Sequence, residues 1–94
     1  MEQLYRAMLE VLDDPKQLRV IVYTNIPTLE SIGEENLYYM IDHSEDCGET
    51  VADHWHVINS DGAGCKFGTN EEVINFFEAI AKMGVELSIH TETY

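Results

Sequence analysis

The residues of this chain with the clearest chemical potential are carboxylates, which cluster in a segment without positive side chains. Between Val20 and Cys65 there are nine Asp and Glu residues and neither Lys nor Arg. They are Glu30, Glu34, Glu35, Asp42, Glu45, Asp46, Glu49, Asp53 and Asp61. Repulsion between like charges destabilises the compact state. We therefore expect the concentrated charge to serve a function. The pattern predicts an acidic binding surface for a strongly positive partner.

The density of charge is comparable to that of nucleic acid. Eighteen carboxylates against five Lys and Arg give a formal net charge of −13 on 94 residues. A compact chain of this size is about 30 Å across, and duplex DNA of that length carries roughly 18 charges. Alternate strand residues are about 6.6–6.8 Å apart, which is comparable to the spacing of neighbouring phosphates. The alternative is an acidic domain whose charges are simply solvated by water.

Two histidines offer a different chemistry. His54 and His56 flank Trp55, and residues two apart on a strand share a face. They could chelate one Zn²⁺, with Cys47 or Cys65 completing the site. In the competing interpretation, Trp55 fills the core and both histidines lie on the open face of a sheet. The sequence has no CxxC or HxxxH spacing that would support a metal site. A small metal-binding protein, enzyme or sensor is therefore only an alternative prediction.

Enzymatic motifs are not recognisable. The glycines of 62–68 fit neither a Walker A loop nor the dinucleotide fingerprint, and a hairpin turn followed by a helix start explains them. Neither cysteine lies in a known nucleophile motif, and both are expected to be free thiols in a reducing compartment. The acids lack the spacing of an EF-hand loop. The sequence therefore predicts no enzyme, no catalytic residue, no bound metal and no cofactor.

Local patterns predict where the elements lie. Apolar residues at helical spacing predict a helix over 2–13, and the capping box Thr69–Glu72 predicts a second helix that ends near Met83, with Gly84 following in a left-handed conformation. Strands are predicted over 18–24, 36–43, 51–59, 65–67 and 85–93. Residues 25–27 are expected to break the first strand, and 28–35 to form a loop or short helical turn.

The resulting order of elements is α-β-β-β-β-α-β. It predicts an α+β fold in which an antiparallel sheet of four to five strands carries two helices on one face. Hydrophobic residues make up 45% of the chain, which favours a folded domain over a disordered acidic tail. We expect one domain over residues 1–94. The start of the sequence lacks signal-peptide character and no apolar run approaches a membrane span, so a cytoplasmic protein is expected.

The acidic pattern on a small α+β domain resembles the DNA-mimic inhibitors made by bacteriophages, particularly the anti-restriction proteins of T-even phages. This resemblance implies a cytoplasmic inhibitor that occupies the DNA-binding site of a host nuclease and does not itself bind nucleic acid. It also implies a homodimer with an elongated acidic face, to whose interface exposed aromatics such as Tyr38 or Tyr39 could contribute. The alternative is an acidic interaction module for another basic partner, such as a DNA-binding or transcription protein.

Overall fold

The computed structural model describes residues 1–27, 36–44 and 54–94, and their elements follow the predicted order. The helices are α1 (Glu2–Asp13) and α2 (Asn70–Lys82). The strands are β1 (Leu18–Pro27), β2 (Asn36–Ser44), β3 (His54–Asn59), β4 (Gly64–Phe67) and β5 (Leu87–Thr93). The prediction of an α+β fold is therefore confirmed.

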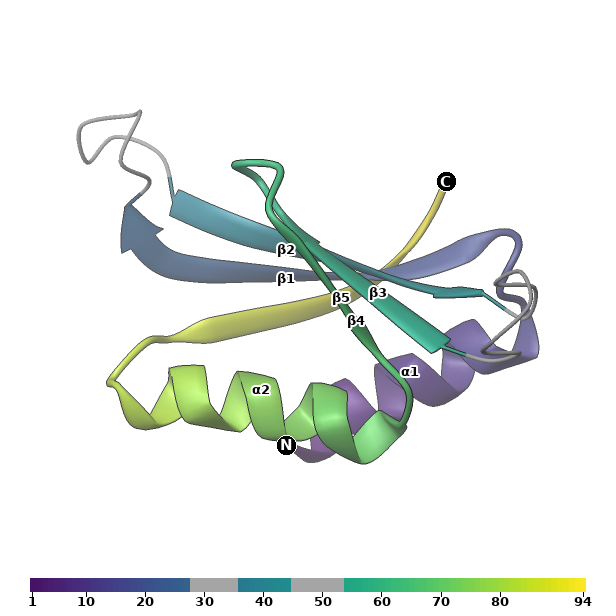
Figure 1. Ribbon diagram of the computed structural model, residues 1–94, viewed down its shortest axis with the longest axis horizontal. Coiled ribbons are helices and arrows are strands. Elements are labelled where there is room, and N and C mark those ends of the chain that lie inside the picture. The colour runs from purple at the N-terminus through teal and green to yellow at the C-terminus, as the bar shows by residue number, and fades with distance from the viewer. Residues whose placement is uncertain (28–35, 45–53) are drawn as a thin grey trace.

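The strands form one antiparallel sheet in the order β4-β3-β2-β1-β5. The first four make a meander, and β5 returns after α2 to pair with β1. Figure 1 shows both helices on the same side of the sheet, as predicted. Among the described residues no helix covers the opposite side, which we call the open face.

The core lies between the helix pair and the sheet. The helices contribute Leu4, Met8, Val11, Val73, Phe77 and Ile80, and the sheet contributes Val20, Val22, Tyr39, Ile41, Trp55 and Val57. The helical residues recur at spacings of three and four, which places them on one side of each helix. The strand residues recur every second position, so their neighbours point to the open face.

Local signals set the ends of α2. The Thr69 hydroxyl accepts a hydrogen bond from the Glu72 backbone N–H at 3.1 Å, as the capping box predicts. The same hydroxyl lies 3.2 Å from Glu72 Oε1, to which it donates. At the other end, Gly84 has φ +86 and its N–H donates to the Ala81 carbonyl. A left-handed glycine after the last turn is the expected helix stop.

Two sequence predictions are wrong in detail. β1 continues through Asn25 and Ile26 to Pro27 rather than breaking there, because the pairing with β2 shifts register between Tyr23 and Pro27. Such an irregularity accommodates a proline, which has no N–H to donate. Tyr39 is not an exposed interface residue: it is 9% exposed and packs edge-on against the Phe77 ring at 5.2 Å. Alternation along β2 places it beside Ile41 on the helix-covered face.

The remaining boundaries agree with the predictions to within a few residues. β5 begins at Leu87 rather than at residue 85, and the predicted start of the third strand, 51–53, lies outside the described residues, as does the predicted loop 28–35. Within the part of the chain that the structure describes, neither helix is long and apolar enough to cross a membrane.

Trp55 connects the sheet to α2 through a hydrogen bond that can be tested. Its side chain is 1% exposed, and its indole N–H donates to Asn70 Oδ1 at 2.7 Å. Asn70→Ala should lower the free energy of unfolding by about 1–3 kcal/mol, because a buried donor loses its acceptor. Asn75→Ala, an exposed position of the same helix, is the matched control for the change in helix propensity. Urea denaturation followed by tryptophan fluorescence measures both variants, and equal midpoints would contradict this role.

Candidate functional site

Two of the nine predicted surface acids lie within the described residues. Asp42 is on β2 and points to the open face, directly opposite His56 of β3. Asp61 is exposed in the turn that joins β3 to β4. The stretch of β3 from His56 to Asn59, about 10 Å long, separates them, so the structure does not bring these two carboxylates together. The other seven lie outside the described residues: Glu30, Glu34, Glu35, Glu45, Asp46, Glu49 and Asp53.

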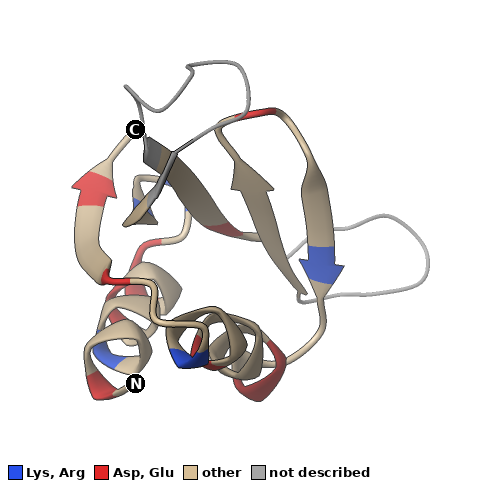
Figure 2. Ribbon diagram, turned by 90° about the vertical axis from the view of Figure 1, so that its left-hand side faces the viewer, with Lys and Arg blue, Asp and Glu red and all other residues tan. Residues whose placement is uncertain are grey.

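Most described carboxylates have no basic partner. Within the described ranges, the ion pairs are Arg6 with Glu2 at 2.6 Å and the N-terminal amine with Glu78 at 3.8 Å. Nine further carboxylates have no base within 4.0 Å among these residues: Glu10, Asp13, Asp14, Asp42, Asp61, Glu71, Glu72, Glu86 and Glu92. Figure 2 shows acidic positions on both helices and on β5 near the C-terminus. The charge is thus distributed over several elements and little of it is neutralised internally.

Aromatic side chains form a cluster on the open face. The Tyr23 ring lies 5.9 Å from the Tyr38 ring and 5.7 Å from the His90 ring, centroid to centroid. Its hydroxyl donates to Glu92 Oε2 at 3.4 Å. Tyr38, which the resemblance suggested as an exposed aromatic, is 36% exposed, and Tyr23 is 45% exposed. The open face therefore combines aromatic surface with the Glu92 carboxylate of β5.

Asp42 is held by the C-terminal residue. The Tyr94 hydroxyl donates to Asp42 Oδ1, and the Tyr94 backbone N–H donates to the Gln17 carbonyl at 2.9 Å. The Arg19 guanidinium carbon lies 5.2 Å from the centroid of the Tyr94 ring, which is a cation–π contact. These contacts fix one predicted acid on the sheet and fasten the end of the chain across β1 and β2.

The structure brings together the two histidines of the predicted metal site. The Nε2 atoms of His54 and His56 are in contact, and their ring centroids are 4.2 Å apart. His54 is buried and His56 is half-buried. Cys65 does not complete the pair, because it lies directly opposite Val57 and so shares the other face. Cys65 is an exposed free thiol, and Cys47 lies outside the described residues. In the described part of the chain no three potential ligands converge on one point.

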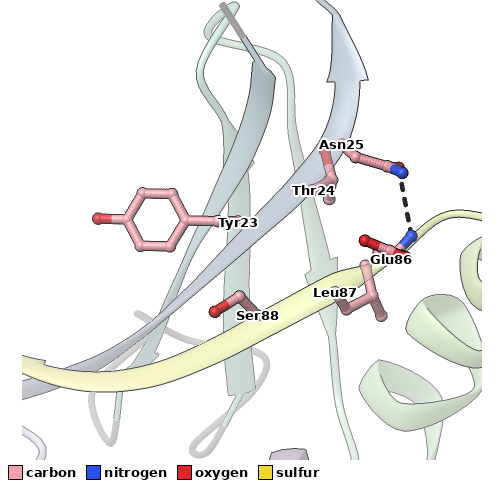
Figure 3. A pocket seen from close by; sticks show the side chains of 6 residues that line it. All are labelled: Tyr23, Thr24, Asn25, Glu86, Leu87 and Ser88. Atoms are coloured by element: carbon pink, nitrogen blue, oxygen red, sulfur yellow. Dashed lines mark hydrogen bonds between the residues drawn. The ribbon is translucent and has the colours of Figure 1, made fainter.

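Sequence reasoning missed one feature, a cleft of about 270 Å³ beside the aromatic cluster. It lies where the end of β1 meets the start of β5, and Figure 3 shows its lining. Apolar and polar residues alternate over 85–93, a pattern that predicts Glu86 and Ser88 on the outer face of the strand. Their proximity to Tyr23 and Asn25 follows from the antiparallel register of β1 with β5, which no local pattern in the sequence specifies.

Comparisons of the chain with protein-family models, with curated proteins and with solved structures found no match. The fold and the site define the class of protein as a small two-layer α+β protein with an open sheet face, unneutralised carboxylates and a histidine pair. The function is therefore inferred from the chemistry of these residues.

The contact between Tyr94 and Asp42 predicts a measurable shift in titration. Partial burial, and then the hydrogen bond to Asp42 and the negative charge of that carboxylate, raise the pKa of Tyr94 well above the ordinary value of about 10. Because the pKa is raised in the folded protein, neutral Tyr94 contributes to the free energy of unfolding below pH 10. This contribution is lost as the pH rises through the raised pKa. Subtracting the tyrosinate absorbance titration of Tyr94→Phe from that of the unmodified protein should isolate a step above pH 10. A step at or below pH 10 would contradict the contact.

Proposed function

We propose that this protein is a non-enzymatic inhibitor that occupies the DNA-binding site of a host nuclease with carboxylates in place of phosphates. The observation that supports it most is the lack of internal charge pairing. Seven of the 18 acids lie outside the described residues, and of the remaining eleven only Glu2 and Glu78 have a basic partner there. Carboxylates whose negative charge is not neutralised by a base among the described residues are available to a positive partner.

The topology distributes the acids along the sheet. Residues 28–35 connect β1 to β2 and hold three Glu, and residues 45–53 connect β2 to β3 and hold four acids. These connections are attached at opposite ends of β2, whose nine residues span about 30 Å. The molecule measures 40 × 26 × 23 Å along its principal axes, and a duplex 40 Å long carries about 24 charges. Eighteen carboxylates on such a body approach that density.

A folded scaffold suits this role because it holds charge in place. Carboxylates on helices and strands do not have to be ordered on binding, so less entropy is lost than with a flexible acidic tail. In size, charge and element content the chain resembles Arn, an anti-restriction protein of T-even phages, which supports the proposal of a nuclease as partner. A homodimer, as this resemblance implies, would double the charged length.

Displacement by DNA separates this function from its nearest alternative. Protein immobilised on beads should capture DNA-binding proteins from a bacterial lysate, and a 20-base-pair duplex should release them. Captured proteins that stay bound at saturating duplex would instead indicate an acidic adaptor that contacts a basic partner away from its DNA site. Inhibition of a captured nuclease, measured as DNA cleavage, then identifies the target.

The charges themselves predict a steep salt dependence. Binding to the captured nuclease should weaken by about tenfold or more between 50 and 200 mM salt, because an electrostatic interface is screened. Neutralising Glu34, Glu35, Asp46 and Glu49 as Gln or Asn should weaken binding further and reduce the salt dependence. The matched control neutralises Glu10, Asp13, Asp14 and Glu71, which changes the net charge equally on the helices. If both variants lost the same affinity for the nuclease, binding would depend on net charge rather than on the arrangement of the acids around the sheet.

A second candidate function, metal binding, is favoured by the contact between His54 and His56. Two imidazole nitrogens that face each other from one strand are a bidentate donor set for Zn²⁺ or a similar ion. With no third ligand in the described residues, water or a partner's side chain would complete the coordination. This site adjoins Asp42 of the proposed acidic surface, which lies directly opposite His56, and it is compatible with that surface.

Zinc titration tests the histidine pair directly. Isothermal titration of the metal-free protein with Zn²⁺ should show one site, and His56→Ala should abolish it, because a bidentate donor becomes monodentate. His90→Ala is the matched control, since His90 is an exposed histidine on the same face with Ser88 as its hydrogen-bond partner at 2.8 Å. Uptake below about 0.1 equivalents of Zn²⁺, or an unchanged isotherm for His56→Ala, would remove this candidate.

A further inference from the structure

The cleft of about 270 Å³ lies where the end of β1 meets the start of β5. Tyr23 pairs with Ser88 and Thr24 with Leu87 in the antiparallel register. The residues that line the cleft are Tyr23, Thr24, Asn25, Glu86, Leu87 and Ser88. In Figure 3 the Tyr23 ring and Ser88 lie on one side, while Asn25 and Glu86 lie toward the other end. We call it the Tyr23 cleft.

One end of the Tyr23 cleft is anionic and well positioned. Glu86 is exposed, has no base within 4.0 Å among the described residues, and has no positive side chain beside it in the lining. Its backbone N–H donates to Asn25 Oδ1 at 3.2 Å, which fixes the chain just before β5 begins. The Glu86 carboxylate is therefore presented from a fixed backbone and is free to accept hydrogen bonds from a ligand.

The other side is aromatic and held in place. Tyr23 contacts both Tyr38 and His90 through its ring, and its hydroxyl donates to Glu92. Although these contacts orient the ring, 45% of the residue stays exposed. A fixed aromatic ring and a carboxylate that line the same cleft suit a ligand that is cationic at one end and apolar along its length.

Size limits the ligand further. Pockets for small molecules and cofactors are typically about 300–1,000 Å³, so a cleft of about 270 Å³ is small for a nucleotide. It has room for one long amino-acid side chain. Arginine matches it better than lysine, because its planar fork donates two parallel hydrogen bonds to a carboxylate and its face stacks on aromatic rings.

We propose that the Tyr23 cleft binds an arginine side chain of the partner protein, with the guanidinium on Glu86 and the aliphatic stem along the Tyr23 ring. This inference rests on the proposed function in one respect, namely that the partner is basic. It adds a short-range contact of defined chemistry to an otherwise long-range acidic surface, and it names the kind of residue on the partner that should be buried there.

The test uses N-acetyl-arginine amide as the probe, titrated into the ¹⁵N-labelled protein and followed by NMR. Saturable shifts should appear at the backbone amides of Tyr23, Asn25 and Ser88. Glu86→Gln should weaken binding by about threefold to tenfold, as expected for one exposed ion pair. Glu71→Gln, an exposed glutamate in the first turn of α2, is the matched control and should bind as the unmodified protein does.

Three outcomes would overturn the proposal. One is equal binding of the neutral citrulline analogue, and another is equal binding of the lysine analogue, which would remove the selectivity for arginine. The third is unchanged affinity in Glu86→Gln. This result can be separated from the proposal of a nuclease partner. If the protein does not bind arginine, but Glu86→Gln still captures proteins that DNA displaces, only the proposal for the cleft is overturned. Saturable arginine binding without DNA-displaceable capture supports the cleft and overturns the nuclease as partner.

Discussion

The packing of two helices against one face of the sheet is the constraint on which the other features depend. It buries every second residue of the central strands, so the identity of the open face follows from the register of the core. Trp55 is the clearest case, since it is 1% exposed and hydrogen-bonded to the first residue of α2. A slip of one residue in β3 would turn Trp55 outward and bury His54 and His56 beneath the helices. The core thereby determines which side chains can meet a partner.

Helix stability explains the placement of some acids but not of others. Glu71 and Glu72 lie in the first turn of α2, where the helix dipole favours negative charge. Asp13 and Asp14 lie at the opposite, unfavourable end of α1, whose last turn holds no basic residue. Each such carboxylate costs about 0.3–1 kcal/mol relative to a neutral side chain. A sequence selected for stability alone would place Lys or Arg there, so the acids at this position favour selection for charge.

Structural features that depend on a few neighbouring residues were predictable from the sequence. Features that depend on how distant strands and helices pack together were not. The capping box at Thr69 and the glycine at 84 set the ends of α2 by local hydrogen bonds and backbone conformation, so they could be recognised directly. The burial of Tyr39 depends on which face of β2 the helices cover, and the cleft between Tyr23 and Glu86 depends on a pairing across more than 60 residues. Pro27 was misjudged because an irregular strand pairing, invisible locally, accommodates it. The histidine pair was predictable because its spacing is itself local.

In the proposed complex, the acidic surface and the Tyr23 cleft act over different distances. Charges felt across a Debye length of about 8–10 Å raise the rate of encounter with any positive protein, but they discriminate poorly among such proteins. Discrimination requires contacts made only when shapes fit, and Tyr23 provides one because its ring is fixed by Tyr38 and His90 while remaining exposed. Solubility alone does not require an exposed aromatic cluster on the sheet face. The two features together therefore fit a surface that attracts basic proteins broadly and retains those with an arginine in the right position.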